Sequence, residues 1–149
     1  MRKTAKTAAL GWMFVISTAL AFSCSGKKTG GMLSEPIDHD QWNRLVKKHV
    51  RGDGMVNYQA FQADRDQLVT YLHKLQEHPP EAATWSREEQ LSYWINAYNA
   101  FTIELILRHY PLETIKDIGS SIQVPFVNTP WDIKFIEIGG EKLDLNNIE

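Results

Sequence analysis

Two asparagines spaced three residues apart are the side chains best suited to chemistry in this sequence. Asn96 and Asn99 lie within residues 94–100, whose sequence is WINAYNA. Residues at i and i+3 share one face of a helix, and each side-chain amide offers an acceptor oxygen and two donor hydrogens. The pair therefore predicts one of two roles: clamps on the backbone of neighbouring loops, or the lining of a polar cleft together with Trp94 and Tyr98.

The only cysteine, Cys24, lies where its position indicates export rather than catalysis. Arg2, Lys3 and Lys6 precede an apolar run over residues 8–22. The run is shorter than the roughly 20 residues of a membrane-spanning helix and is typical of a signal-peptide core. Its last residues, LAFSC, resemble the lipobox of bacterial lipoproteins, in which the cysteine becomes the lipidated N-terminus.

The export signal leaves two outcomes open. Cleavage after the ALA sequence at 19–21 would release a soluble secreted protein. Lipidation is favoured, because residues 24–37 begin with a polar, glycine-rich stretch that suits a flexible tether. We expect a signal peptide over residues 1–23 and a lipid on Cys24 that anchors the protein to a bacterial envelope membrane, outer or periplasm-facing.

The composition limits the kinds of partner. The chain has 16 Lys and Arg against 18 Asp and Glu, and the loss of three basic residues with the signal leaves 13 against 18, a net charge of −5. Such an acidic chain is not expected to bind nucleic acid. Its 43% hydrophobic and 11% aromatic residues suffice for one folded domain over residues 38–149.

One stretch invites a comparison with calcium sites. If Gly54 were the sixth residue of an EF-hand loop, the oxygen-ligand positions would hold His49, Arg51 and Ala60. A tight turn at Asp53 and Gly54, followed by a short strand, is the better interpretation. The histidines lack paired metal-ligand spacing, so neither a metal nor a cofactor is expected.

The remaining titratable groups do not form a catalytic set. His109 favours a helix C-terminus when protonated and has no nucleophile to serve. Glu104 and Asp132 are expected on the solvated surface, because nothing in the sequence brings them together. Trp131 is expected to be an aromatic anchor at the start of a strand. No catalytic residue is assigned.

The two asparagines need a long helix to position them. Ser86 and Glu89 form a capping box that predicts its start, and Pro111 predicts its end. Apolar residues recur on several faces of this segment, from Leu91 to Leu107. The helix is therefore expected to be surrounded by protein on most sides.

Two amphipathic helices are expected before the long helix. One starts from an N-cap at Asp38, and the other extends between Phe61 and Leu75. After the long helix we expect a short helix at 112–118 and a loop at 120–130.

The C-terminal residues indicate a hairpin. Alternating residues at 132–138 and the pair Gly139 and Gly140 predict an antiparallel β-hairpin, followed by a helix start capped by Asn146. Helices followed by a hairpin indicate a helix-rich α+β fold. Because the last residues look like a first helical turn, we expect an incomplete domain.

Residues 85–102, WSREEQLSYWINAYNAFT, carry a family resemblance. They resemble the core motif of domain of unknown function 547 (DUF547), whose typical helix is "reeqlaFWINaYNaltI". The likeness extends from Trp42 to Glu149 and includes DGMVNY at 53–58 and LNNIE at 145–149.

The resemblance implies where family chemistry would lie. Family members continue into a further half with a His-bearing strand and cysteines near a Cys-Pro pair, so residues 38–149 would be the N-terminal part of such a domain. We expect an envelope lipoprotein with no catalysis in this chain. One alternative is a fragment of a thiol-dependent hydrolase or transferase. The other is a peptide-binding or scaffold module that presents Asn96 and Asn99 to a partner.

Overall fold

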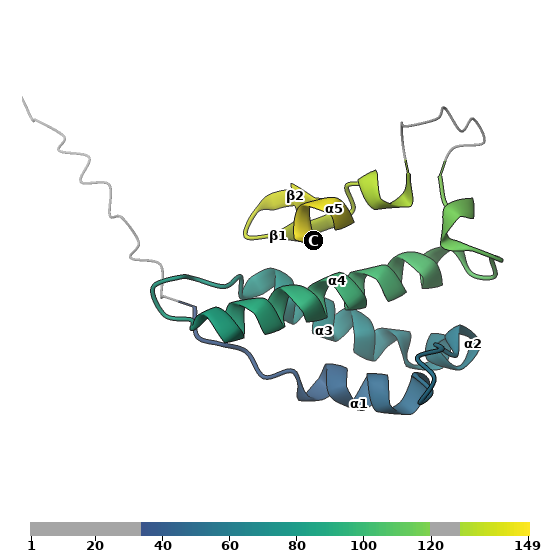
Figure 1. The fold of residues 1–149 in the computed structure, drawn as a ribbon, viewed down its shortest axis with the longest axis horizontal. Coiled ribbons are helices and arrows are strands. Elements are labelled where there is room, and N and C mark those ends of the chain that lie inside the picture. Colours follow the sequence, from purple (N-terminus) through teal and green to yellow (C-terminus); the bar gives the residue numbers. More distant parts are fainter. Residues whose placement is uncertain (1–33, 120–128) are drawn as a thin grey trace, which may run out of the picture. The chain divides into compact units, whose positions relative to one another are not determined.

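The structure, a computed structural model, describes residues 34–119 and 129–149. The expected signal peptide, Cys24, most of the tether and residues 120–128 of the expected loop lie outside these residues. Three helices, α1 (Asp40–His49), α3 (Arg65–Glu77) and α4 (Arg87–His109), dominate the described part (Figure 1). Both α1 and α4 pack against α3.

The predicted helix-rich α+β fold is confirmed: the described residues form several helices and one β-hairpin. Strands β1 (Ile136–Ile138) and β2 (Glu141–Leu143) are antiparallel, with Ile136 opposite Leu143. The turn uses Gly139 at φ 61° and Gly140 at φ 82°, a region of φ that favours glycine. The short elements are α2 (Tyr58–Phe61), the 3-10 helices η1 (Gln62–Asp64), η2 (Ile115–Asp117) and η3 (Pro130–Asp132), and α5 (Leu145–Ile148).

The predicted start of α4 is confirmed at atomic detail. The backbone N–H of Glu89 donates to Ser86 Oγ at 3.2 Å, and the backbone N–H of Ser86 donates to Glu89 Oε2 at 2.7 Å. These bonds satisfy two amides that would otherwise lack partners at the helix N-terminus. The helix then continues to His109, just before Pro111.

Two predicted caps are wrong by one or two residues. The N-cap of α1 is His39 rather than Asp38, whose carboxylate accepts a hydrogen bond from Lys74 at 2.7 Å. The cap of α5 is Asp144 rather than Asn146, since Asp144 Oδ1 accepts from the backbone N–H of Asn147 at 2.9 Å. Where several Asp and Asn residues lie close together, the sequence alone does not show which residue is the N-cap of the helix.

Two predicted elements are shorter than expected. The helix between Phe61 and Leu75 is interrupted by η1 at residues 62–64. The strand expected from Asp132 begins only at Ile136, because Asp132 closes the 3-10 turn η3 by accepting from the backbone N–H of Thr129 at 2.8 Å. The expected turn before residue 55 is present, and an isolated bridge between residues 50 and 56 follows it.

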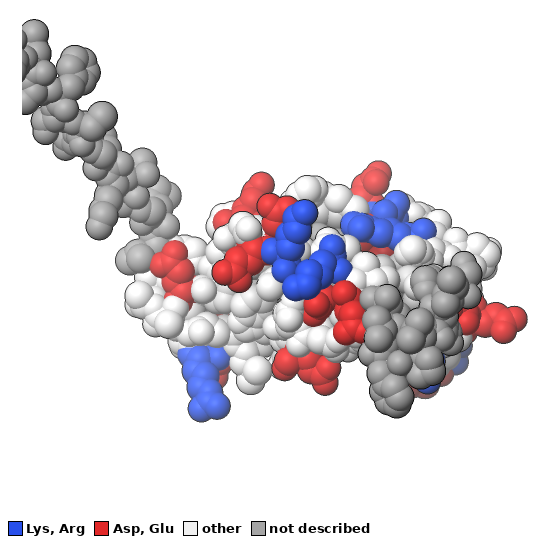
Figure 2. Space-filling model, turned by 90° about the horizontal axis from the view of Figure 1, so that it is seen from above, with Lys and Arg blue, Asp and Glu red and all other residues white. Residues whose placement is uncertain are grey.

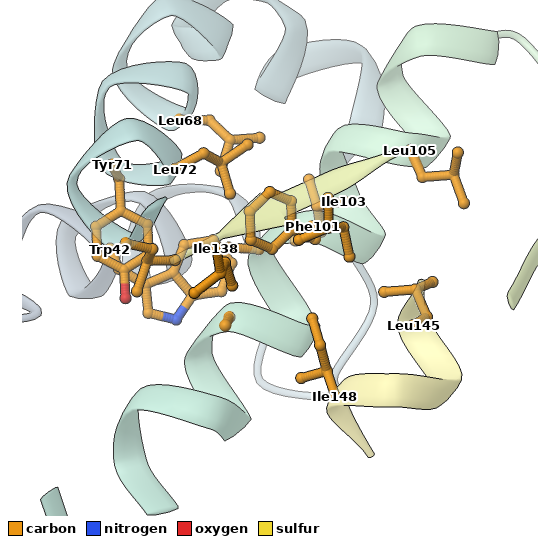
Figure 3. Close-up of a cluster of buried hydrophobic side chains, with 14 of the residues drawn as sticks. Trp42, Leu68, Tyr71, Leu72, Phe101, Ile103, Leu105, Ile138, Leu145 and Ile148 are labelled. Atoms are coloured by element: carbon orange, nitrogen blue, oxygen red, sulfur yellow. The ribbon is translucent and has the colours of Figure 1, made fainter. Parts of the chain in front are cut away.

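The core fills the space between the helices and the hairpin (Figure 3). Trp42 of α1 stacks on Tyr71 of α3 with ring centroids 5.7 Å apart and an interplanar angle of 8°. Tyr93 of α4 is fully buried and donates to the carbonyl of Leu75 at 2.6 Å. Besides Trp42 and Tyr71, the residues labelled in Figure 3 are Leu68 and Leu72 of α3, Phe101, Ile103 and Leu105 of α4, Ile138 of β1, and Leu145 and Ile148 of α5.

Glu104 lies inside the protein rather than on the surface as expected. Its residue is 1% exposed, and its carboxylate accepts from Arg65 Nη2 at 2.7 Å and Arg108 Nε at 2.8 Å. Asp132, in contrast, is exposed as expected. Within residues 34–119 and 129–149, no helix has both the length and the hydrophobicity needed to span a bilayer.

Candidate functional site

One side of the first half of α4 faces solvent, whereas its second half is enclosed by protein as expected. Leu91 is 59% exposed and Ile95 is 52% exposed, and Asn99 one turn further is also exposed. The residues at 91, 95 and 99 follow one another at i, i+4 spacing, so they form one stripe. We call this stripe the open face of α4.

An apolar hollow of about 580 Å³ flanks the open face on the side of α5. Tyr98 in its wall is held by a hydrogen bond of 3.2 Å from Trp131 Nε1 to the tyrosine hydroxyl. Trp94 packs edge-on against the buried Tyr93, with centroids 4.9 Å apart. The hollow is lined by Leu91, Trp94, Ile95, Tyr98 and Asn99 of α4 and by Asn147, Ile148 and Glu149.

A polar furrow of about 460 Å³ flanks the open face on the side of α1. Since α1 and α4 both pack on α3, the furrow lies between two helices that share a support. Its lining consists of His39, Trp42, Asn43, Val46 and Val50 from the α1 side, Gly54 and Val56 from the following turn, and Asn96, Asn99 and Ile103 from α4.

His39 lines the furrow and contacts a buried residue of the core. Its Nδ1 lies 2.6 Å from the hydroxyl of the fully buried Tyr71. Burial raises the pKa of Tyr71, so the phenol keeps its proton. Burial first, and the charge of Lys74 second, lower the pKa of His39, whereas Asp38 opposes this shift. The imidazole is therefore neutral at pH 7.

The four residues predicted to line a cleft are divided between the two depressions. Trp94 and Tyr98 line the apolar hollow, Asn96 lines the polar furrow, and Asn99 borders both. Asn99 Nδ2 donates to the carbonyl of Ile95, one turn back on α4, at 2.9 Å. Within the described part of the chain, neither asparagine bonds a neighbouring loop, and the Asn96 side chain has no hydrogen-bond partner.

Most residues that line the two depressions were not predicted as site residues from the sequence, among them Leu91, Ile95, His39 and Asn43. Leu91 and Ile95 were expected in the core. This expectation was wrong, because an apolar pair at i, i+4 does not show whether the fold covers that side of the helix. His39 and Asn43 belong to α1, and only the tertiary fold brings them to α4. The polar residues Glu88 and Ser92, which lie close to Leu91 on the helix, were the one sequence signal that this side of α4 is exposed.

A second histidine pair is unsuited to catalysis. His49 Nε2 lies 2.6 Å from Asp64 Oδ2, and its ring is 4.5 Å from that of Phe61. His49 is only 4% exposed, so no substrate reaches it. The pair stabilises the junction between α1 and α3 instead.

The described part of the protein carries no patch of a single charge on the face seen in Figure 2. Acidic and basic side chains are intermixed on the face seen in Figure 2. The lining of the polar furrow includes no Asp, Glu, Lys or Arg. Among the residues that the structure describes, no group of three His, Cys, Asp or Glu side chains is placed to hold a metal ion.

Comparison with known proteins gives one finding. Residues 82–149 match the model of the family described as "Protein of unknown function, DUF547", which is consistent with a DUF547 domain in this part of the chain. The predicted family resemblance is confirmed over this range, which includes α4, the hairpin and α5. No curated protein and no solved structure matched the chain.

Proposed function

We propose that this chain is an exported peptide-binding module and that its ligand lies on the open face of α4. The observation that carries the proposal is the exposure of Leu91 and Ile95, at 59% and 52%, beside the apolar hollow. Large aliphatic side chains exposed together beside a concave surface mark interaction sites.

The hollow supplies both affinity and orientation. Trp94 and Tyr98 give rigid aromatic walls, and Asn99 supplies a carboxamide at the edge. Burying a leucine-sized side chain of a ligand contributes about 1.5–3 kcal/mol. Aromatic residues with a few polar groups around them are typical of the energetic centre of protein interfaces.

Calorimetric titration of the full-length chain with the capped peptide acetyl-Ser-Leu-Ala-Leu-Ser-amide tests this proposal. We expect saturable binding by the wild type. The double variant Leu91→Ser, Ile95→Ser should bind at least tenfold more weakly, because each loss of an apolar contact approaches the 1.4 kcal/mol that corresponds to a factor of ten.

The control is His73→Ala, an exposed change on α3 outside both depressions. It should leave the affinity unchanged. Equal affinity for the wild type and the double variant, or no binding by the wild type, would refute the proposal.

The location of this module is a separate part of the proposal. The basic N-terminus, the apolar run at 8–22 and the lipobox-like LAFSC support lipidation at Cys24 and attachment to the bacterial envelope. After labelling of cells with a radioactive fatty acid, the wild type should carry the label and partition with membranes. Cys24→Ala should not, and a variant that still carries the label would disprove the anchor.

The thiol-dependent alternative receives no support from a particular group. Cys24 is the only thiol in the sequence and is the residue proposed to carry the lipid. A nucleophile with an adjacent base is required for such chemistry. Among the described residues, the exposed Leu91 and Ile95 beside the apolar hollow support peptide binding best.

A further inference from the structure

We propose that the polar furrow recognises the main chain of an extended, uncharged peptide segment. This inference rests on the proposed function and adds the class of ligand and the atoms that bind it. Leu91 and Ile95 would hold side chains, whereas His39, Asn43 and Asn96 would hold backbone amides.

The length of the furrow suits an extended chain. Its α1 wall extends from His39 to Val50, which at 1.5 Å per residue is about 16 Å. An extended peptide advances about 3.3 Å per residue. About five residues would therefore lie along this wall, whereas a compact ligand would leave much of it uncovered.

The side chains along the furrow match the repeating groups of a peptide. Each peptide unit has one N–H donor and one carbonyl acceptor, and a carboxamide offers both kinds of partner. Asn43 of α1 and Asn96 of α4 both line the furrow, and neither side chain has a hydrogen-bond partner among the described residues. Asn99 donates within α4, which leaves its oxygen as an acceptor.

His39 adds a donor with a fixed tautomer. The protonated phenol of Tyr71 has His39 Nδ1 as its hydrogen-bond partner within the described residues. If the phenol donates to Nδ1, the neutral imidazole carries its proton on Nε2. Nε2 is then the ring atom left to donate to a peptide carbonyl in the furrow.

The absence of charge on the described lining residues selects against charged ligands. A carboxylate or ammonium group placed in the furrow would lose water without gaining an ion pair. Three carboxamides and one neutral imidazole satisfy neutral amides instead. The furrow therefore favours a segment without Asp, Glu, Lys or Arg at the positions that enter it.

An amide-to-ester substitution in the ligand tests the inference. The full-length chain is titrated with acetyl-Ser-Leu-Ala-Leu-Ser-amide and with an analogue in which two ester links replace the two central amide bonds. The analogue keeps all side chains and loses two N–H donors. We expect it to bind about tenfold more weakly to the wild type.

Furrow variants complete the test. Asn43→Ala, Asn96→Ala and His39→Leu should each weaken binding of the all-amide peptide at least threefold, with unchanged melting temperatures for the asparagine variants. His39→Gln, which keeps a neutral N–H donor, should retain most of the affinity. His73→Ala is again the control.

The outcomes separate this inference from the proposed function. Equal binding of the amide and ester peptides would overturn main-chain recognition. Loss of affinity only in the Leu91→Ser, Ile95→Ser variant, with the furrow variants unaffected, would also overturn it and leave the proposed function in place. Absence of binding by any peptide would overturn both.

Discussion

Glu104 illustrates how a single residue of α4 determines which side of the helix is buried. Its carboxylate lies inside the fold and pairs with Arg65 of α3 and Arg108 of α4. Burial alone would raise the pKa of Glu104, but the hydrogen bonds and charges of the two arginines outweigh it and hold the pKa below its usual 4.5. Because Arg65 lies 39 residues away along the chain, this pair could not be predicted from local sequence.

Replacement of this carboxylate is expected to cost stability in a pH-dependent manner. Glu104→Gln should lower the free energy of unfolding at pH 7 by about 1.5–3 kcal/mol, the range for hydrogen bonds to charged groups. A carboxyl group whose pKa is depressed by folding stabilises the fold above its unfolded pKa, and this contribution is lost as the pH falls through the folded pKa. The difference from wild type should therefore narrow below pH 4.5.

Urea denaturation at a series of pH values measures this effect. Glu137→Gln, at an exposed position of β1, is the matched control and should change little. A difference between Glu104→Gln and wild type that is the same at pH 7 and at pH 3 would contradict the linkage.

The helix α4 is the element on which both the fold and the candidate site depend. Its second half is buried from Phe101 to Leu107 except at Thr102, which is partly exposed, whereas its first half exposes Leu91 and Ile95. The capping box at Ser86 fixes where the helix starts. The second half of α4 therefore contributes mainly to the core, whereas its first half carries the exposed apolar residues of the candidate site.

Loss of the cap should weaken the fold modestly. Ser86→Ala removes the hydroxyl that accepts from the backbone N–H of Glu89, and such a change costs about 1 kcal/mol. Ser92→Ala, the same substitution at an exposed interior position of α4, should be neutral or slightly stabilising because alanine has the higher helix propensity. Equal destabilisation by both substitutions, measured by urea denaturation, would show that the capping box does not stabilise the fold.

Local signals predicted the elements, and long-range contacts decided the site. Ser86 with Glu89, and Gly139 with Gly140, lie within three residues of one another, so their capping and turn geometry follows from local chemistry. The exposure of Leu91 and the placement of His39 beside α4 depend on how three helices pack. Periodicity shows that a helix has an apolar face but not which of several apolar faces the fold covers.

At the scale of the whole molecule, the described residues form one exposed stripe on α4 with one depression on each side of it. The apolar hollow lies towards α5, the polar furrow lies towards α1, and Asn99 borders both. This arrangement suits one ligand that presents side chains to one flank and main chain to the other. A lipid on Cys24 would hold that surface near the envelope, as the N-terminal sequence predicts.

Mapping of backbone amide chemical shifts would show whether a peptide binds to the open face of α4. The ¹⁵N-labelled full-length chain is titrated with acetyl-Ser-Leu-Ala-Leu-Ser-amide, and the shift of every assigned amide is followed. The account predicts saturable changes in residues 39–50, in residues 91–103 of α4 and at α5, with little change on the exposed side of α3 around His73. No change at α4, or changes concentrated away from its open face, would contradict it.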